Sequence, residues 1–181
     1  MKKLYTTVFL AVLYFPSAQV IIGDQAGTAP AGQKGSVLLE FAAGQNKGLL
    51  LPYVRVLPAA AAEGTIVLDA SGSNAARVKY YNGSWVDLSG QDGNISAVLS
   101  SQPTAGQAPE DPAAKTIIGA RSSAADGVLV LESADKAMVL PVVSDVQDIS
   151  NPSPGMMVYV NRAGAKRLAV FNGNKWSFWK P

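Results

Sequence analysis

Short apolar runs follow one another along most of the chain, and each is bounded by glycine, asparagine, aspartate, serine or lysine. Residues 36–41 and 49–56 are two such runs, and residues 65–69, 77–81 and 84–88 follow the same pattern. Short runs of β-branched and aliphatic residues between turn residues are typical of β-strands, whereas a helix needs a longer segment with a 3.6-residue period. The pattern therefore predicts an all-β fold made of two tandem small meander or hairpin units.

Turn residues place the hairpins within this pattern. Asn82-Gly83 separates two strand-like runs and favours a two-residue type I′ turn, in which both central residues need positive φ. Residues 172–174, Asn-Gly-Asn, are one residue longer and predict a three-residue loop with a bulge. Pro52 and Pro141 cannot donate a backbone hydrogen bond, so each is expected at a sheet edge or a strand bend.

The chain contains two copies of one sequence unit. Five blocks recur in the same order with similar spacing, which indicates a duplicated structural unit. We expect a first β unit over residues 19–88 and a second over residues 116–181, joined by a Gly-, Ser-, Ala-, Pro- and Gln-rich linker over residues 89–115. The paired blocks are IIG (21–23 and 117–119), GSVLLEF with GVLVLES (35–41 and 127–133), KGLLLPYV with KAMVLPVV (47–54 and 136–143), GTIVLD with GMMVYV (64–69 and 155–160), and RVKYYNGSW with RLAVFNGNKW (77–85 and 167–176).

The apolar runs in each unit are continuous rather than alternating. VLLEF (37–41) and LLLPYV (49–54) have too few polar positions for a strand with one solvated face, so we expect both faces to be buried. A unit of about 60 residues buries only about 60% of its unfolded surface and is marginally stable alone. The missing cover must come from the sister unit or from another chain, and we therefore expect a homo-oligomer.

The first residues have the features of an export signal. Lys2 and Lys3 precede the apolar residues 4–15, and Ala18 offers a small residue for cleavage. A membrane-spanning helix needs about 20 apolar residues, which this stretch does not reach. We expect residues 1–18 to be removed, no membrane span in the mature chain, and a location at the cell surface, outside the cell or in the periplasm.

The composition excludes several kinds of chemistry. The chain has no Cys and no His, which excludes thiolate and imidazole catalysis, disulfides, and ordinary zinc, haem and iron–sulfur sites. Residues 92–94, Asp-Gly-Asn, lack the spaced acidic ligands of a calcium loop, and Ser133 with Lys136 lacks the strained turn of a serine nucleophile. Glu40 and Glu132 are equivalent in the two copies, which favours a repeated structural role over a catalytic pair. We expect no catalytic residues, no cofactor and no metal.

Charge is distributed unevenly along the chain. The full chain has 15 basic and 13 acidic residues, and loss of Lys2 and Lys3 with the signal leaves 13 of each sign. Residues 89–148 carry three basic and eight acidic side chains, whereas residues 149–181 carry five basic and no acidic ones. The acidic segment would repel nucleic acid, so we do not expect nucleic acid as a partner. Attraction between the two segments, within a chain or between chains, is the expected consequence.

Aromatic residues gather on the last hairpin of each copy. The candidates for contact with a ligand or partner are Tyr81, Trp85, Trp176, Phe178 and Trp179. If exposed, they would offer a stacking platform for sugars or a binding surface for protein; if buried, they would form the core of each unit. Successive side chains of a strand point to opposite faces, so Trp176 and Phe178 can enter the core while Trp179 remains for an interface.

The order of these motifs resembles a repeat of secreted surface and fibre-like proteins of Bacteroidetes-type bacteria and of phage tail-fibre-like proteins. The matching motifs are SVLLEF, KGLLLPYV, GTIVLD and KYYNGSW in the first copy, and GVLVLES, KAMVLPVV, GMMVYV and AVFNGNKW in the second. The resemblance covers nearly all of the chain after residue 18 and implies intertwined β-rich trimers used for attachment. The chain departs from long fibres because it has two units and no coiled-coil or collagen-like shaft.

These features together predict an exported, non-enzymatic structural or adhesion protein that acts through assembly at the bacterial surface or in a fibre-like complex. Its expected partners are copies of itself, with a trimer favoured, or other surface proteins. The alternative is a carbohydrate-binding module that uses the hairpin aromatics to hold a glycan. A secreted hydrolase is a third class, which the residues support least.

Overall fold

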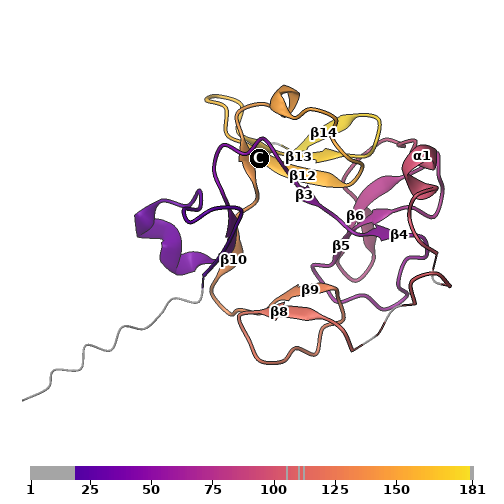
Figure 1. Ribbon diagram of the computed structural model, residues 1–181, viewed down its shortest axis with the longest axis horizontal. Helices are drawn as coiled ribbons and strands as arrows, with labels where there is room; N and C mark the ends of the chain where they lie inside the picture. The colour runs from indigo at the N-terminus through magenta and orange to yellow at the C-terminus, as the bar shows by residue number, and fades with distance from the viewer. Residues whose placement is uncertain (1–18, 105, 110, 112, 180–181) are drawn as a thin grey trace, which may run out of the picture.

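The computed structural model describes residues 19–179 except 105, 110 and 112, and the expected signal peptide, residues 1–18, lies outside the described residues. The chain folds into short strands that form four sheets in a solenoid-like arrangement (Figure 1). Helical structure in this part of the chain is limited to two 3-10 helices, Ala31–Ser36 and Val146–Asp148, and the α1 turn, Ser96–Leu99. The prediction of an all-β fold is confirmed. No helix among these residues is long and apolar enough to cross a membrane.

The two copies of the repeat form the same four-stranded meander. The sheet order is β4-β5-β6-β7 in the first copy and β11-β12-β13-β14 in the second. In each sheet the first pair of strands is parallel and the next two pairs are antiparallel. The strands in chain order are β1 (Val20–Ile22), β2 (Val37–Phe41), β3 (Leu49–Leu50), β4 (Tyr53–Val54), β5 (Ile66–Asp69), β6 (Arg77–Tyr81), β7 (Trp85–Asp87), β8 (Thr116–Ile118), β9 (Leu129–Leu131), β10 (Ala137–Met138), β11 (Val142–Val143), β12 (Met156–Val160), β13 (Arg167–Phe171) and β14 (Trp176–Trp179).

A parallel strand pair precedes each meander. β1 pairs with β2, and β8 pairs with β9. The two registers differ by two residues, because Leu39 lies opposite Val20, whereas its equivalent Leu131 lies opposite Ile118 rather than Thr116. A shift of two residues keeps every side chain on its own face, so the apolar pattern tolerates both registers.

The prolines lie where strands end, which goes further than the sheet edge or strand bend predicted at each of them. Residues 49–54 form β3 and β4 rather than one strand, and β10 is separated from β11 in the same way. The carbonyl of Pro52 accepts a hydrogen bond from Leu68 N, and that of Pro141 accepts one from Tyr159 N, both at 2.9 Å. Because proline has no N–H to give to a ladder, the chain can leave the sheet just before it.

The first hairpin turn differs from the prediction. Tyr81 pairs with Trp85, so the loop has three residues, and of these only Gly83 has positive φ, at +71°. Asn82 is not in the left-handed region, so the turn is not type I′. The reason is that the Asn82 N–H donates across the loop to the carbonyl of Ser84 at 3.0 Å, which closes a wider turn.

The second hairpin loop is also longer than predicted. Phe171 pairs with Trp176, which leaves four loop residues instead of three. The buried Asn172 side chain holds this loop, because its Oδ1 accepts the backbone N–H of Asn174 at 3.0 Å and of Lys175 at 2.9 Å. A side chain that replaces backbone partners in this way allows a longer loop than the Asn-Gly pattern indicates.

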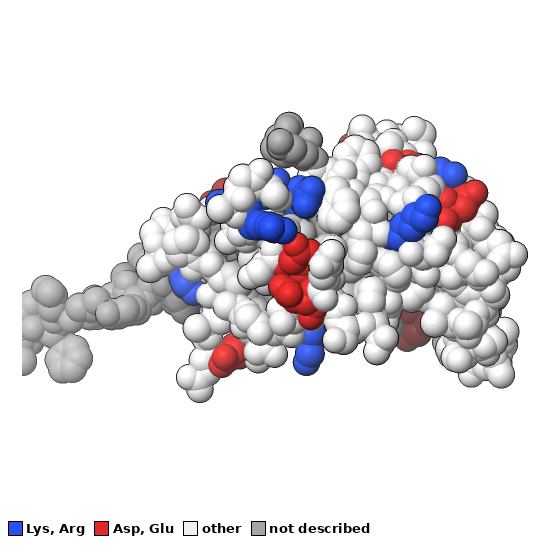
Figure 2. Space-filling model, turned by 90° about the horizontal axis from the view of Figure 1, so that it is seen from above, with Lys and Arg blue, Asp and Glu red and all other residues white. Residues whose placement is uncertain are grey.

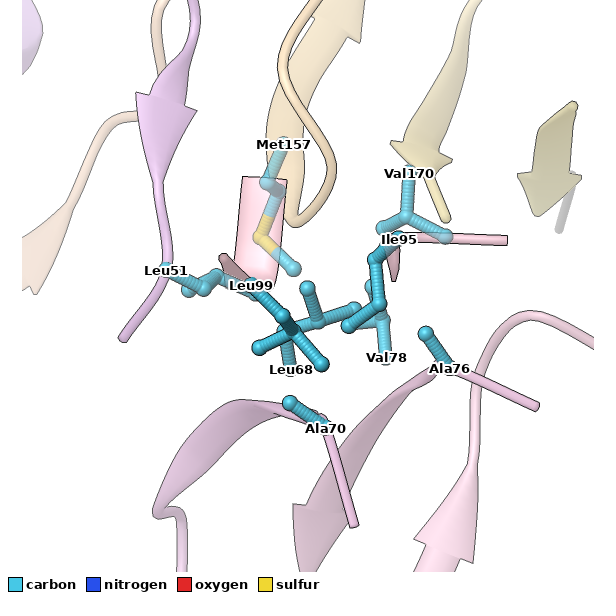
Figure 3. Close-up of a cluster of buried hydrophobic side chains, with 9 residues drawn as sticks. All are labelled: Leu51, Leu68, Ala70, Ala76, Val78, Ile95, Leu99, Met157 and Val170. Atoms are coloured by element: carbon cyan, nitrogen blue, oxygen red, sulfur yellow. The ribbon is translucent and has the colours of Figure 1, made fainter. Parts of the chain in front are cut away.

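The largest core cluster is built by both copies together. Leu68 and Val78 of the first meander are fully buried and face Met157 and Val170 of the second (Figure 3). The sister units therefore cover each other, which is one of the two sources of cover that the continuous apolar runs left open. The prediction that both faces of residues 49–54 are buried is wrong, because Leu50, on the short strand β3, is 52% exposed. The buried members of this cluster are Leu51, Leu68, Ala70, Ala76, Val78, Ile95, Leu99, Met157 and Val170, and a second cluster consists of Val143, Ile149, Val158, Val160 and Ala169.

The connecting residues 89–115 also take part in this core, which their composition did not predict. Ile95 and Leu99, at the α1 turn, are buried in the largest cluster. The amide of Gln91 donates to Ser177 Oγ at 3.1 Å, and the Gln91 carbonyl accepts from Asn172 Nδ2 at 2.8 Å. The segment therefore fixes the two copies to each other as well as joining them.

Candidate assembly interface

Each copy has a short extended segment between its parallel strand pair and its meander. The first arm is residues 47–51, which contain β3, and the second arm is residues 136–140, which contain β10. In the described part of the chain neither arm pairs with a strand of its own copy. Each arm pairs with the other copy instead, so the candidate interface of this protein begins as an exchange of strands between its two halves.

The first arm adds to the meander of the second copy. β3 runs antiparallel to β12, with Leu49 opposite Met157 and Leu50 opposite Met156. Figure 1 shows β3 beside β12, on the side of that strand away from β13. The arm thereby occupies the edge of β12 that β11 leaves open towards its N-terminal end.

Two details fix the first arm closely on β12. The N–H of Leu51 donates to the carbonyl of Gly155 at 3.1 Å. A Cβ atom on Gly48 would lie 2.3 Å from Cγ of Met156, which is far inside van der Waals contact. Glycine is therefore required at this position because the backbone of the arm passes directly over a large side chain.

The second arm adds to a different strand. β10 runs parallel to β2, with Ala137 opposite Val37 and Met138 opposite Leu39. The N–H of Val139 donates to the carbonyl of Leu39 at 2.8 Å. Because β1 pairs with its other edge, β2 is the central strand of a three-stranded sheet.

The exchange of arms is therefore not reciprocal. The first arm pairs with the meander of the second copy, but the second arm pairs with β2 and not with the meander of the first copy. Two strand edges are covered in one copy and open in the other, within the described residues. β3 covers the N-terminal part of one edge of β12, but no strand lies beside the equivalent part of β5. In the same way, β10 covers one edge of β2, but no strand lies beside the equivalent edge of β9. Open strand edges of this kind are templates for pairing with another chain.

The missing cover changes the burial of equivalent residues. Val37 in β2 is 4% exposed, whereas its equivalent in β9, Leu129, is 43% exposed. The neighbouring Val128 is 72% exposed. A cavity of about 570 Å³ opens beside β9 and the second arm and is lined by Leu38, Gly119, Glu132, Ser133, Ala134, Asp135 and Lys136. The second copy thus presents apolar surface where the first has a packed strand.

The two equivalent glutamates also differ. Glu40 is fully buried and accepts hydrogen bonds from Ala29 N at 2.7 Å, from Lys34 Nζ at 3.2 Å and from the Gln19 side chain. Its equivalent Glu132 is exposed. The predicted structural role is confirmed at Glu40 and wrong at Glu132, because the loop before β9 is four residues shorter than the loop that wraps Glu40.

The aromatic residues of the hairpins form two separate ring pairs. The Tyr81 and Trp85 rings meet edge to face with centroids 5.3 Å apart, and the Phe171 and Trp176 rings meet at 5.2 Å. All four are half-buried, and Trp176 packs against the second core cluster. Three of the five candidate residues, Tyr81, Trp85 and Trp176, therefore serve the packing of their own hairpins.

The remaining two candidates lie on β14 and are exposed. Phe178 is 43% exposed and lies under the guanidinium of Arg167, 4.5 Å from the ring centroid. Trp179 is 45% exposed, and its Nε1–H donates to the carbonyl of Leu88 at 2.7 Å. The Trp179 bond joins the last strand of the second copy to the end of the first meander. The two rings belong to consecutive residues of a strand, so they point to opposite faces and do not form one platform.

Several charged side chains of the described residues form ion pairs within the chain. Burial opposes ionisation of Asp69, but hydrogen bonds from Lys79 and Ser71 outweigh it and lower the pKa of Asp69 below the ordinary 3.8. Lys79 Nζ lies 2.7 Å from Asp69 Oδ2. Arg162 of the basic segment pairs at 3.0 Å with Asp145 of the acidic segment, an attraction within the chain. Figure 2 shows a face that is mostly uncharged, on which blue and red side chains adjoin in small groups with white surface between the groups.

Comparison with known proteins gives one match. Residues 117–180, about a third of the chain, match the family model of a phage tail-like trimerisation region. The matched range includes the second arm and the whole second meander. No curated protein and no solved structure matches this chain. The repeated β architecture and this match support a structural, fibre-like protein that forms a homo-oligomer.

The two arms are elements of the fold that the sequence pattern did not predict. The apolar run of residues 49–56 predicts one strand, whereas the part before Pro52 leaves the meander and pairs elsewhere. A signal was present, because three aliphatic residues before a proline are too few for a ladder of their own. The strand that such a segment joins lies far away in the sequence, and the periodicity of apolar residues gives no information about that pairing.

Proposed function

We propose that this chain is an exported structural protein that assembles as a homotrimer within a fibre-like complex at a bacterial surface. The non-reciprocal exchange of arms carries the proposal, because it leaves two strand edges without cover in the described chain. The resemblance to secreted Bacteroidetes-type and tail-fibre repeats supports the surface location. The family match of residues 117–180 supports three as the number of copies.

The sparse charge of the surface supports the same function. Only 15% of residues are charged, against about 25% in typical globular domains. The exposed apolar residues Leu129 and Val128 lie at the open edge of β9 and next to it. The cores of protein interfaces are depleted in charge and enriched in such apolar contacts, so this surface suits a protein that works in contact with its own kind.

The acidic residues support a non-catalytic role. Glu40 is buried with its oxygens taken up by Ala29, Lys34 and Gln19, and Glu132 is exposed on a different sheet. Glycoside hydrolysis needs two carboxyl groups that flank one bond, with at least one free to transfer a proton. These two side chains have neither a shared cleft nor equivalent surroundings.

Binding of a glycan is the alternative function, and Phe178 and Trp179 are the residues available for it. Both are exposed, but they lie on opposite faces of β14, and Arg167 already covers one face of Phe178. A sugar platform requires rings that share a face, so the geometry favours assembly over glycan binding.

The mass of the mature chain in solution tests this proposal. Residues 19–181 are purified and examined by light scattering over a range of concentrations, together with native mass spectrometry. We expect a stable trimer in the absence of any ligand. A monomer at micromolar concentration whose tryptophan fluorescence shifts with added oligosaccharide would refute assembly and support glycan binding.

A further inference from the structure

We infer that neighbouring copies of this chain join head to tail by strand addition: the second arm of one copy pairs with β5 of the next, and the first arm of that next copy pairs with β9 of the former. This inference rests on the proposed function and specifies its interface. Each of these two pairings repeats, between copies, one that the duplicated halves already make within the chain.

The edge of β5 has the same backbone geometry as the occupied edge of β12. In the second copy, Leu51 N donates to Gly155 O, the residue that precedes β12. The equivalents of these groups are Leu140 N on the second arm and Gly64 O before β5, and neither has a backbone partner among the described residues. Gly64 and Gly155 donate their own N–H to the neighbouring strand in the same way, to Tyr81 O and Phe171 O. The donor and the acceptor are therefore both available.

The side chains at this edge match in size. In the occupied pairing, glycine is required at position 48 because Met156 lies under it. The second arm has Ala137 in place of Gly48, and β5 is preceded by Thr65 in place of Met156. The larger residue on the arm thus coincides with the smaller residue on the sheet at this contact. The other close contact of a Cβ at position 48, Val158 Cγ1 at 2.8 Å, has Val67 in the equivalent place and requires a small shift. Close packing depends on such volume compensation across a contact.

The edge of β9 is equally prepared for the first arm. Thr116 N donates to Val128 O, and Glu132 N donates to Ile118 O, so the backbone groups of the even-numbered residues from 128 to 132 point towards β8. Backbone groups alternate along a strand, which directs those of Leu129 and Leu131 outwards. In β2 the outward carbonyl of Leu39 accepts Val139 N, as the outward Leu131 carbonyl would accept Leu50 N of the next copy.

The first arm has a free side for this second partner. Leu51 N donates towards β12, and alternation along the arm then directs the N–H of Leu50 away from β12. β3 has β12 as its one strand neighbour within the described residues. Between copies, each arm becomes the middle strand of three, with one edge on its own chain and one on its neighbour.

Each copy thus has two unlike sides: one carries the second arm and the open edge of β9, and the other carries the first arm and the open edge of β5. A contact between unlike surfaces closes into a ring or grows into an open filament. The match of residues 117–180 to a trimerisation region sets the ring at three copies. In this ring both arms of every copy and the open edges of β5 and β9 are paired. Because all copies are equivalent in such a ring, the exchange within each chain is retained.

An engineered disulfide tests the pairing directly, since the native chain has no cysteine. In the structure Leu50 lies opposite Met156, next to the hydrogen-bonded pair of Leu51 and Gly155, so Leu50 and Met156 form a non-hydrogen-bonded pair. The Cα atoms of such a pair are about 4.5 Å apart. A disulfide spans this separation. The equivalent pair between copies is Val139 with Thr65. We expect the double variant Thr65→Cys/Val139→Cys to oxidise to a covalent species of three chain masses on a non-reducing gel.

Matched variants make the result specific. Leu50→Cys/Met156→Cys should give a disulfide within one chain and no covalent oligomer, because that pair lies inside the copy. A mixture of the two single variants, Thr65→Cys and Val139→Cys, should give a covalent dimer, whereas neither should do so alone.

The outcomes separate this pairing from the proposed function. A ladder of covalent multimers would support the head-to-tail pairing and refute closure at three. A trimer by light scattering that forms no disulfide between positions 65 and 139, or only one within a chain, would overturn this interface and leave assembly standing. A monomer in both experiments would refute both.

Discussion

Replacement of Glu40 and Glu132 by alanine, one at a time, compares two equivalent residues of one chain in different surroundings. Glu40 is 0% exposed and accepts hydrogen bonds from the buried Ala29 N–H, from Lys34 and from Gln19. Glu132 is exposed. We expect Glu40→Ala to destabilise the protein strongly and Glu132→Ala to have almost no effect.

The magnitude follows from the partners that Glu40→Ala would leave. The Ala29 N–H would remain buried without an acceptor, which costs about 1–3 kcal/mol. The Lys34 side chain is 36% exposed, so it can regain water, and the loss of its ion pair adds only about 0–1 kcal/mol. The expected loss is therefore about 1–4 kcal/mol. An exposed residue without such partners changes stability by about 0.5 kcal/mol or less.

Urea unfolding of residues 19–181, followed by circular dichroism at one fixed protein concentration, measures this difference. With a slope of about 2 kcal/mol per molar urea, Glu40→Ala should lower the midpoint by about 0.5–2 M, and Glu132→Ala by less than about 0.3 M. Equal midpoints for the two variants would refute the reasoning, because they would show that the buried carboxylate does not hold the loop over β2.

The remaining predictions concern a turn, a buried carboxyl and the dependence of one copy on the other. Gly83 has φ +71°, so Gly83→Val should lower the free energy of unfolding by about 1–2 kcal/mol in thermal or urea unfolding. Gly32→Val, at a position without positive φ and with open space around it, should be nearly neutral. Equal losses of stability in the two variants would contradict the turn. The pKa of Asp69 is lowered in the folded protein, so the stability that it provides is present above its ordinary pKa and is lost as the pH falls through its folded value. Urea midpoints measured between pH 7 and pH 3 should therefore fall more steeply below about pH 4 for the wild type than for Asp69→Asn, and parallel curves would contradict this assignment. Residues 19–88 expressed alone lack β10, one of the two strand partners of β2, and β12, the strand partner of β3. They should therefore be unfolded or self-associated by circular dichroism and light scattering, and a cooperatively melting monomer would contradict the exchange of arms.

Local features of this fold could be predicted from the sequence because they depend on near neighbours. The duplication, the strand character of each block and the breaks at Pro52 and Pro141 all follow from residue type and spacing, and the structure confirms them. The burial of both faces of β2 was also predictable, because VLLEF has few polar positions. Each of these properties is set within about ten residues.

Features that depend on distant partners could not be predicted. Glu40 and Glu132 occupy equivalent positions in the two copies, and the wrapping of the loop before β2 makes their surroundings different. Ile95 and Leu99 lie in a Gly- and Ser-rich segment, and their burial depends on the space between two meanders. The Asn-Gly signal located the first hairpin but gave the wrong turn type, because a bond across the loop from Asn82 to Ser84 decides its width.

The exchange of arms also determines the order in which this protein can fold. Leu50 pairs with Met156, and Val37 pairs with Ala137, so both contacts close loops of about a hundred residues. The entropy of closing such loops is lost before either pairing contributes, which slows the search for the native state. A chain made from its N-terminus leaves β2 without β10 until Ala137 and Met138, about three quarters of the way along the sequence, have been synthesised. The first copy must therefore remain incomplete through most of synthesis, with an apolar strand edge that is open to aggregation or to a chaperone.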